Sequence, residues 1–341
     1  MKKILALALA LCMIFALCAC GATVTTTTTT TTTEASTEEA APAEEAAQTY
    51  TVGICQLVQH DALDAATQGF EDALTEALGD NVTFDFQNAQ GDSPTCSTIV
   101  TSFVANDYDL IMGNATPALQ AAIAATDVIP ILGTSVTDYA TALNDDSMDP
   151  AKGTGINVSG ASDGVDAQLY ADLVMELVPE AKNVSVVYCS AEPNSVVQSD
   201  NFCAAMEATY GITPNVYTFA DSNDIQAVVT SAVADCDALY IPTDNTAASN
   251  MTIVSNICQP AGIPVICGEE NMCAAGGLAT VSISYYDIGH LAGEQAVDIL
   301  VNGADISTMP IAYSTNPVKE YNADYASAIG FEMPEGFTAI G

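Results

Sequence analysis

Short strand-like runs alternate with amphipathic helical runs from residue 49 onward, and this alternation limits the fold more than any other feature. Residues 50–57 form a β-rich apolar run, residues 62–78 have helical periodicity, and residues 82–87 are again strand-like. Such alternation is typical of βαβ units around a parallel sheet. The pattern runs to about residue 158 and then restarts. It predicts an α/β protein with two doubly wound parallel-sheet lobes and a ligand cleft between them.

The charge of the chain is strongly one-sided, because 43 acidic residues stand against five lysines and no arginine. Binding to a phosphate backbone depends on Lys and Arg, so the composition argues against a nucleic-acid partner. It also excludes a polybasic membrane-binding patch. Without arginine, a ligand carboxylate or phosphate has to be held by neutral donors.

The N-terminus has the pattern of an export signal. A basic start is followed by an apolar run too short to span a bilayer comfortably and then by Leu17-Cys18-Ala19-Cys20. This box resembles the bacterial lipoprotein signal, which predicts a signal peptide over residues 1–19 and a lipid on Cys20. Residues 20–48 are rich in Thr and then in Glu, Ala and Pro, which predicts a disordered tether. A simply cleaved secretory signal or an uncleaved anchor is the alternative.

Catalytic and metal-binding patterns are missing from the sequence. The eight cysteines after residue 48 include no C-x-x-C pair, and the chain has two histidines, His60 and His290. The spacing favours buried thiols over a metal site, although an exported protein could also form disulfides. The chain contains no G-x-S-x-G, H-E-x-x-H or P-loop motif. We therefore predict a binding protein rather than an enzyme, with no metal and no cofactor.

Polar segments follow the predicted strands, where an open α/β sheet binds its ligands. The most informative segments are QHD at 59–61, NATPALQA at 114–121, YCSAEPNSVV at 188–197, YIPTDNT at 240–246 and SYYDIGHLAG at 284–293. With 52–74 and 263–269, they resemble the substrate-binding lipoproteins of bacterial ABC importers. The resemblance is to the family typified by tryptophan- and tyrosine-binding members with a type I periplasmic-binding fold, and it extends from about residue 50 to 312.

The resemblance implies both an architecture and a biological setting. One lobe would comprise residues 49–158 and 285–303, and the other residues 159–284 and 304–341. The chain would be lipid-anchored at the extracytoplasmic face of the cell membrane and would deliver an amino acid, foremost an aromatic or apolar one, to a membrane permease and its ATPase. A sugar or nucleoside ligand is the alternative, as is a ligand-presenting sensor domain.

An amino acid needs donors for its carboxylate and acceptors for its ammonium group, and the strand ends offer both. The hydroxyl donors that we predict for the carboxylate are Thr116, Ser135, Thr137 and Ser195, each of which could instead be a helix cap. The carboxylates that we predict for the ammonium group are Asp163, Glu192, Asp244 and Glu269. Asp244 with Asn245 could equally cap a helix.

Amide and ring side chains complete the predicted site. Asn194 and Asn245 are candidate ligand contacts, because an amide both donates and accepts hydrogen bonds. Gln59 is a further candidate, with a loop or capping role as the alternative. Tyr285 and Tyr286 are candidates for the wall of a side-chain pocket, with core packing as the alternative. His60 is interpreted as a loop or capping residue rather than a ligand contact.

Overall fold

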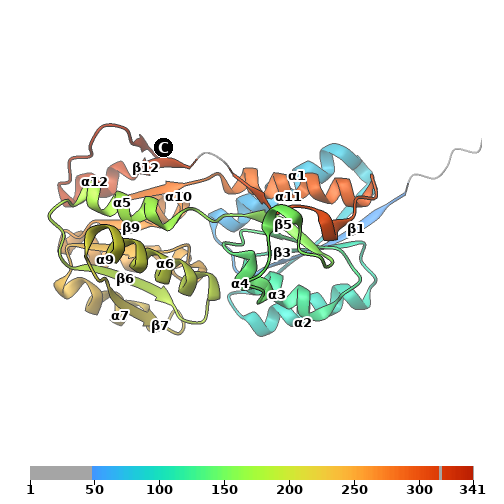
Figure 1. Cartoon of the computed structure of the whole chain (residues 1–341), viewed down its shortest axis with the longest axis horizontal. Helices are drawn as coiled ribbons and strands as arrows, with labels where there is room; N and C mark the ends of the chain where they lie inside the picture. Colours follow the sequence, from blue (N-terminus) through green and yellow to red (C-terminus); the bar gives the residue numbers. More distant parts are fainter. Residues whose placement is uncertain (1–47, 315–316, 341) are drawn as a thin grey trace, which may run out of the picture. The chain divides into compact units, whose positions relative to one another are not determined.

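The alternation of strands and helices builds two sheets in a computed structural model that describes residues 48–314 and 317–340 (Figure 1). Both sheets belong to the unit Ala47–Gly341. The predicted signal peptide, Cys20 and all of the tether except its last residue lie outside the described residues. The predicted fold class is confirmed.

The first lobe is built on a six-stranded parallel sheet in the order β11-β5-β4-β3-β1-β2. Its strands are β1 Tyr50–Gln56, β2 Val82–Asn88, β3 Leu110–Asn114, β4 Ile131–Thr134, β5 Val158–Ser162 and β11 Ala312–Tyr313. Its helices are α1 Asp61–Leu78, α2 Ser93–Ala105, α3 Thr116–Ala125, α4 Tyr139–Leu143 and α11 Tyr285–Leu300. Apolar clusters on both sides of this sheet explain why β3, β4 and β5 are buried along their whole length.

The second lobe has a seven-stranded sheet in the order β13-β12-β10-β9-β8-β6-β7, in which β12 runs antiparallel to β10. Its strands are β6 Val184–Cys189, β7 Asn215–Phe219, β8 Ala238–Ile241, β9 Val265–Cys267, β10 Ala279–Ser282, β12 Val318–Tyr321 and β13 Thr338–Ala339. Its helices are α5 Ala167–Leu177, α6 Pro193–Tyr210, α7 Ile225–Ala232, α8 Asn245–Ala248, α9 Met251–Ala261, α10 Glu270–Gly276 and α12 Ala323–Ile329. One apolar cluster, which includes Phe202 and Tyr240, forms its core.

The chain crosses between the lobes at positions that differ from the expected boundaries. The second lobe was expected to begin at residue 159, but β5 continues to Ser162 in the first sheet. Residues 304–341 were expected in the second lobe, but β11 pairs with β5 of the first. The small side chains and glycine of β5 gave no apolar run that would show where the strand ends, and a two-residue strand has no periodicity to detect.

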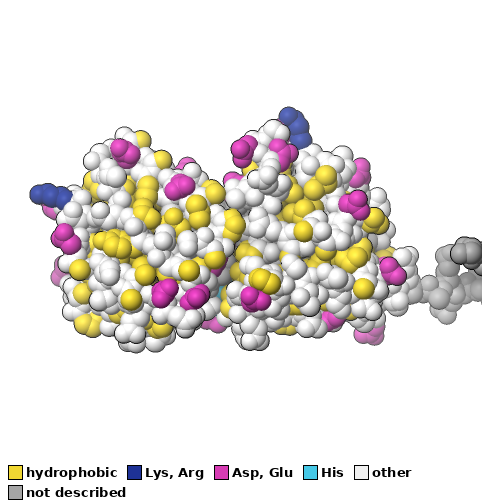
Figure 2. Space-filling view, turned by 90° about the horizontal axis from the view of Figure 1, so that it is seen from below, with side chains coloured by type: hydrophobic (Ala, Val, Ile, Leu, Met, Phe, Trp, Pro, Cys, Tyr) yellow, Lys and Arg dark blue, Asp and Glu magenta, His cyan; other side chains and the backbone are white. Residues whose placement is uncertain are grey.

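Acidic side chains are scattered over one face of the molecule rather than gathered in one place. Figure 2 shows Asp and Glu spread over this face, with basic side chains at its edge. Lys152 pairs with Asp149, and Lys319 pairs with Glu176.

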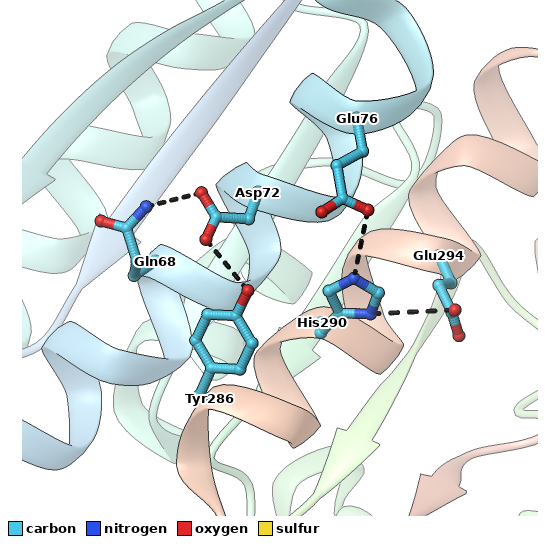
Figure 3. A network of polar contacts seen from close by, with 6 residues as sticks. All are labelled: Gln68, Asp72, Glu76, Tyr286, His290 and Glu294. Carbon is cyan, nitrogen blue, oxygen red and sulfur yellow. Dashed lines mark hydrogen bonds and ion pairs between the residues drawn. The ribbon is translucent and has the colours of Figure 1, made fainter.

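Helices α1 and α11 lie side by side and complete the first lobe, because glycines let their backbones approach closely. A Cβ atom at Gly69 would overlap the carbonyl oxygen of Tyr286, and one at Gly289 would overlap that of Ala66. At the solvent-facing edge of this contact, Tyr286 donates a hydrogen bond of 3.0 Å to Asp72 (Figure 3). The glycines thus let a helix from the N-terminal part of the described sequence pack closely against a helix from its C-terminal part.

We expect Gly289→Val to lower the free energy of unfolding by about 1–3 kcal/mol, because the added methyl groups have to displace the backbone of α1. Glu294→Ala on the exposed side of the same helix is the matched control and should change it by less than about 0.5 kcal/mol. Urea unfolding of both variants measures the difference. Equal stabilities would contradict the close packing of α1 against α11.

Candidate ligand-binding site

The carboxyl ends of strands from both sheets meet at a small cavity of about 10 Å³, room for roughly one water molecule. From the first lobe and its crossing segments come His60 after β1, Leu63 on α1, Ser135 after β4, Asp163 after β5 and Tyr285 on α11. The second lobe contributes Asn194, Thr243, Asp244, Asn245, Ala248, Glu269 and Met272. This cavity lies at the strand ends of both lobes, where the sequence predicts the site.

Several predicted site residues are brought together here and others are not. Those that line the cavity are Ser135, Asp163, Asn194, Asp244, Asn245 and Glu269. Those that lie outside its lining are Gln59, Thr116, Thr137, Glu192 and Ser195.

Asp163 is a buried carboxyl group with one engaged oxygen. Its Oδ2 accepts a hydrogen bond of 2.7 Å from the Tyr285 hydroxyl. Its Oδ1 is buried and has no hydrogen-bond partner among residues 48–314 and 317–340. Burial raises the pKa of Asp163 above its ordinary value, whereas the nearby hydroxyl groups of Tyr285 and Thr137 act in the opposite direction. A cationic group beside Oδ1 would stabilise the ionised form.

Asp244 and Glu269 have both carboxyl oxygens engaged by backbone N–H groups, so they act as helix caps. Asp244 accepts hydrogen bonds from the N–H groups of Cys189 (2.6 Å) and Ala247 (2.7 Å). Glu269 accepts from those of Asn271 (2.6 Å) and Met272 (2.5 Å). The sequence had left capping open for Asp244. Their role as ammonium acceptors stays a prediction, with weaker support than for Asp163.

Burial also controls the ionisation of these two capping groups. Burial, together with the neighbouring charge of Glu192, raises the pKa of Asp244 to about 8. Burial raises the pKa of Glu269 to about 7, against the lowering effect of its own hydrogen bonds. Both shifts favour the uncharged carboxyl form, which lessens the repulsion between the carboxyl groups that meet at the site.

Glu192 lies behind the cavity and fixes the start of α8. Its Oε2 accepts hydrogen bonds from the backbone N–H (3.0 Å) and side-chain Nδ2 (2.7 Å) of Asn245. Its Oε1 accepts from the backbone N–H (2.8 Å) and hydroxyl (2.7 Å) of Thr246. These four bonds orient Asn245 and engage both oxygens of Glu192, whose role as a ligand contact stays a prediction.

The lining contains a set of buried polar atoms that no group in the described part of the chain satisfies. They are His60 Nδ1, Ser135 Oγ, Asp163 Oδ1 and Asn194 Oδ1. The orientation of Asn194 is determined, because its Nδ2 donates to the Thr243 carbonyl oxygen at 2.9 Å. A buried polar atom without a partner costs about 1–3 kcal/mol, so four of them around one cavity indicate a site for a polar ligand group.

A second set of unsatisfied atoms consists of hydroxyl groups where β3 and β4 end. The hydroxyls of Thr116, Thr134 and Ser135 are buried and have no partner within residues 48–314 and 317–340. The backbone there is strained, with φ of 83° at Ala115 and 55° at Ser135. Helix α3 begins here, and its N-cap residue Ala115 supplies no side-chain cap. These features suit an anionic group.

The remaining predicted residues have other partners. Gln59 is exposed, and its Nε2 donates to Asp64 at 3.4 Å. The Thr137 hydroxyl accepts a hydrogen bond of 3.0 Å from Gln198 of the other lobe. Ser195 is buried in the first turn of α6, where its hydroxyl accepts from Asn194 at 3.3 Å. The sequence prediction used position after a strand, and this position does not distinguish these residues from those that line the cavity.

Sequence reasoning missed or undervalued other lining residues. His60 was interpreted as a loop or capping residue, yet it lines the cavity and makes no side-chain cap to α1. Leu63, Thr243 and Met272 were not singled out, and Tyr285 was considered only as a wall. Thr243 lies inside the PTDNT segment, so that segment held a signal, whereas Leu63 and Met272 look like ordinary helix core residues.

Within residues 48–314 and 317–340, no group of three or more His, Cys, Asp or Glu side chains is arranged to hold a metal ion. In the same part of the chain, the helices are too short or too polar to cross a membrane. The eight cysteines of this part are free thiols, six of them buried.

Comparison with known proteins identifies the family. The model of the family described as ABC transporter substrate binding protein matches residues 51–338. The chain belongs to this family. The substrate-binding proteins are a class of ligand-binding proteins, so the predicted resemblance and the prediction of a non-enzymatic chain are both confirmed.

Individual relatives of this substrate-binding protein are known by sequence and structure. A tyrosine-binding protein of Clostridioides difficile (strain R20291) is 39% identical over 264 residues, which cover 76% of this chain and 75% of that one. A Streptococcus pneumonia protein solved in complex with L-Trp is 32% identical, with a TM-score of 0.80 over 86% of this chain and all of that one. A Clostridium difficile substrate binding protein with adhesive properties, solved ligand-free and open, is 39% identical, with a TM-score of 0.64 over 85% of this chain and 99% of that one.

We expect Asp244→Ala to destabilise this substrate-binding protein by about 2–4 kcal/mol, because it leaves the N–H groups of Cys189 and Ala247 buried without acceptors. Asp305→Ala, at an exposed cap, is the matched control and should cost about 1 kcal/mol or less. Chemical denaturation of the ligand-free protein compares the two. An Asp244 variant as stable as the control would contradict the capping role.

Proposed function

We propose that this chain is the extracytoplasmic solute-binding component of an ABC importer and that it captures an amino acid by closing its lobes. The observation that carries the proposal is the pairing of two unsatisfied sets at one site. Acceptors around Asp163 complement an ammonium group, and hydroxyls around Ser135 complement a carboxylate. A zwitterion has a charged group for each set.

The acceptors favour an ammonium group over a neutral polar group. Asp163 Oδ1 and Asn194 Oδ1 can only accept hydrogen bonds, and a primary ammonium group has three N–H donors and no acceptor. The lining residues given by the structure include no Lys or Arg, so the positive charge has to come from the ligand. Charge-assisted hydrogen bonds to a buried carboxylate are among the strongest available.

A ligand carboxylate can be held here by hydroxyl groups instead of an arginine. The hydroxyls of Thr116, Thr134 and Ser135 stand at the ends of β3 and β4, beside the start of α3. Hydroxyl donors and the positive end of a helix dipole together stabilise an anion. This arrangement supports the sequence prediction for Thr116 and Ser135.

The side chain of the ligand is proposed to be aromatic or apolar. Leu63, Met272 and the ring of Tyr285 provide apolar lining beside the polar atoms. The relatives named as tyrosine-binding and solved with L-Trp support tyrosine and tryptophan as the first candidates.

We propose that the lobes open and close, because the cavity in this arrangement is too small for a ligand to enter. Its volume of about 10 Å³ is far below the roughly 300 Å³ or more of typical ligand pockets. The lobes therefore have to separate before a ligand enters. The TM-score is 0.80 against the tryptophan-bound relative and 0.64 against the open one, although the sequence identity to the open one is higher, at 39% against 32%. This difference supports two arrangements of the lobes in the family.

Titration calorimetry with the twenty amino acids and a panel of sugars and nucleosides tests this function. We expect heat from L-tryptophan or L-tyrosine and none from sugars or nucleosides. Because the chain has no tryptophan, the fluorescence of added L-tryptophan gives an independent readout. Heat from sugars or nucleosides alone would favour the alternative ligand class and reject the amino-acid proposal.

Asp163→Asn should weaken amino-acid binding by about 10–100-fold, because it removes the carboxylate charge while keeping an acceptor for the Tyr285 hydroxyl. Asp166→Asn is the matched control, because Asp166 is exposed, lies in the same crossing segment, and caps α5 in a way that asparagine can reproduce. The dissociation constants from the same titration measure both. An Asp163 variant that binds normally would remove this residue from the site.

The membrane anchor is proposed from the sequence alone. Cys20→Ser should prevent incorporation of labelled fatty acid and release the protein from the membrane fraction, because the acceptor thiol is lost. Cys18→Ser is the matched control and should leave both unchanged. Labelling that persists in the Cys20 variant would reject lipidation at this position.

A further inference from the structure

We propose that His60 is a specificity-determining residue, which accepts a hydrogen bond from the ligand ammonium group through Nδ1 only while its Nε2 is bound to Asn245 of the other lobe. This inference rests on the proposed function, because it concerns the same site. It adds a residue that the sequence had interpreted as a loop or capping residue. It also ties recognition of the amine to the closed arrangement of the lobes.

The tautomer of His60 follows from a chain of hydrogen bonds. Glu192 accepts the Nδ2 hydrogens of Asn245 at 2.7 Å, so the amide oxygen of Asn245 points the other way. That oxygen, Oδ1, lies 3.2 Å from His60 Nε2. Because Oδ1 can only accept, Nε2 has to carry the hydrogen. In a neutral imidazole ring, Nδ1 is then left as an acceptor.

The unsatisfied nitrogen is on a residue that lines the cavity. His60 Nδ1 is buried and has no hydrogen-bond partner in the described part of the chain, and His60 lines the cavity together with Asp163 and Asn194. With Asp163 Oδ1 and Asn194 Oδ1, it makes three acceptors, which match the three N–H donors of a primary ammonium group.

The ring environment supports the neutral form that the proposal needs. Burial lowers the pKa of His60, while the hydrogen bond to Asn245 and the charges of Glu192, Asp64 and Asp61 act in the opposite direction. A protonated ring would present a donor at Nδ1 and repel an ammonium group. The geometry of Asn245 and the buried position of Nδ1 agree with the same protonation state.

The hydrogen bond between His60 and Asn245 joins the two lobes. His60 precedes α1 of the first lobe, and Asn245 is the first residue of α8 in the second. Separation of the lobes breaks this bond and frees the ring to rotate. The acceptor is then oriented for the ligand only in the closed arrangement, so the contact contributes to amine recognition and to closure at once.

Nitrogen NMR of the histidine rings tests the tautomer and the contact. The chain has only two histidines, and His290 lies on the α1–α11 surface, 3.9 Å from Glu76 and 3.7 Å from Glu294, which makes it an internal control (Figure 3). With the purified protein saturated with L-tryptophan or L-tyrosine, we expect His60 to carry its hydrogen on Nε2. Addition of the amino acid should shift its Nδ1 resonance and leave His290 unchanged. A hydrogen on Nδ1, or an Nδ1 signal that ligand does not move, would overturn the inference.

Two substitutions separate the two nitrogens of the ring. In His60→Gln, the side-chain amide reaches the position of Nε2 and can still donate to Asn245, but the acceptor at Nδ1 is lost. In His60→Asn, the amide oxygen takes the position of Nδ1, but the link to Asn245 is lost. We expect His60→Gln to weaken binding of the primary amine about tenfold.

The informative quantity is the ratio of the dissociation constants of N-methyl-L-tryptophan and L-tryptophan. The amine of N-methyl-L-tryptophan has one N–H fewer, so in the wild type one of the three proposed acceptors is left without a donor. His60→Gln should bring the ratio toward one, because Asp163 and Asn194 still satisfy the two remaining donors. His60→Asn should keep a wild-type ratio with weaker binding of both compounds. His290→Gln should change neither constant.

The outcomes separate this inference from the proposed function. No binding of any amino acid by the wild type would overturn both. Binding by the wild type with an unchanged affinity and ratio in His60→Gln would overturn the inference and leave the proposed function standing. A merely structural role for His60 would weaken both compounds equally in both variants, and that result would also overturn the inference.

Discussion

The site depends on burying several carboxyl groups where two sheets meet without a lysine or arginine among the lining side chains that the structure describes. Backbone N–H groups at helix starts satisfy Asp244 and Glu269, and Asn245 and Thr246 satisfy Glu192. One oxygen of Asp163 has no such partner there. The protein thus stabilises these acidic groups with N–H and hydroxyl dipoles, and it leaves one carboxyl oxygen, Asp163 Oδ1, without a partner in the described part of the chain. This arrangement replaces the arginine that the chain does not have.

Most of the fold could be predicted from the sequence, because strands buried on both faces appear as continuous apolar runs and helices as a 3.6-residue period. Residues 184–189 and 238–241 are examples in which the apolar run coincides with the strand. The prediction was wrong at the crossings. There β5 reads Val-Ser-Gly-Ala-Ser, which is buried by the helices and strands around it rather than by its own hydrophobicity.

The location of the site could be predicted from the sequence, but the roles of its residues could be predicted only in part. Strand-end position and family resemblance brought Ser135, Asp163 and Asn194 into the prediction, and all three line the cavity. Position in the chain cannot show which oxygen of a carboxyl group is already bonded, so Asp163 and Glu192 looked equivalent. His60 was undervalued for the same reason, because the partner that orients its ring lies in the other lobe, at Asn245.

The pairing of α1 with α11 has a consequence for biogenesis. Helix α1 ends at Leu78, whereas the helix that covers it begins at Tyr285 and the edge strand of the same lobe at Ala312. The first lobe therefore cannot bury its core until nearly the whole chain is available. Contacts between segments so far apart in the sequence slow folding, because a long loop has to close before they form. The first lobe consequently completes its fold late, although it contains the first strand and helix of the described sequence.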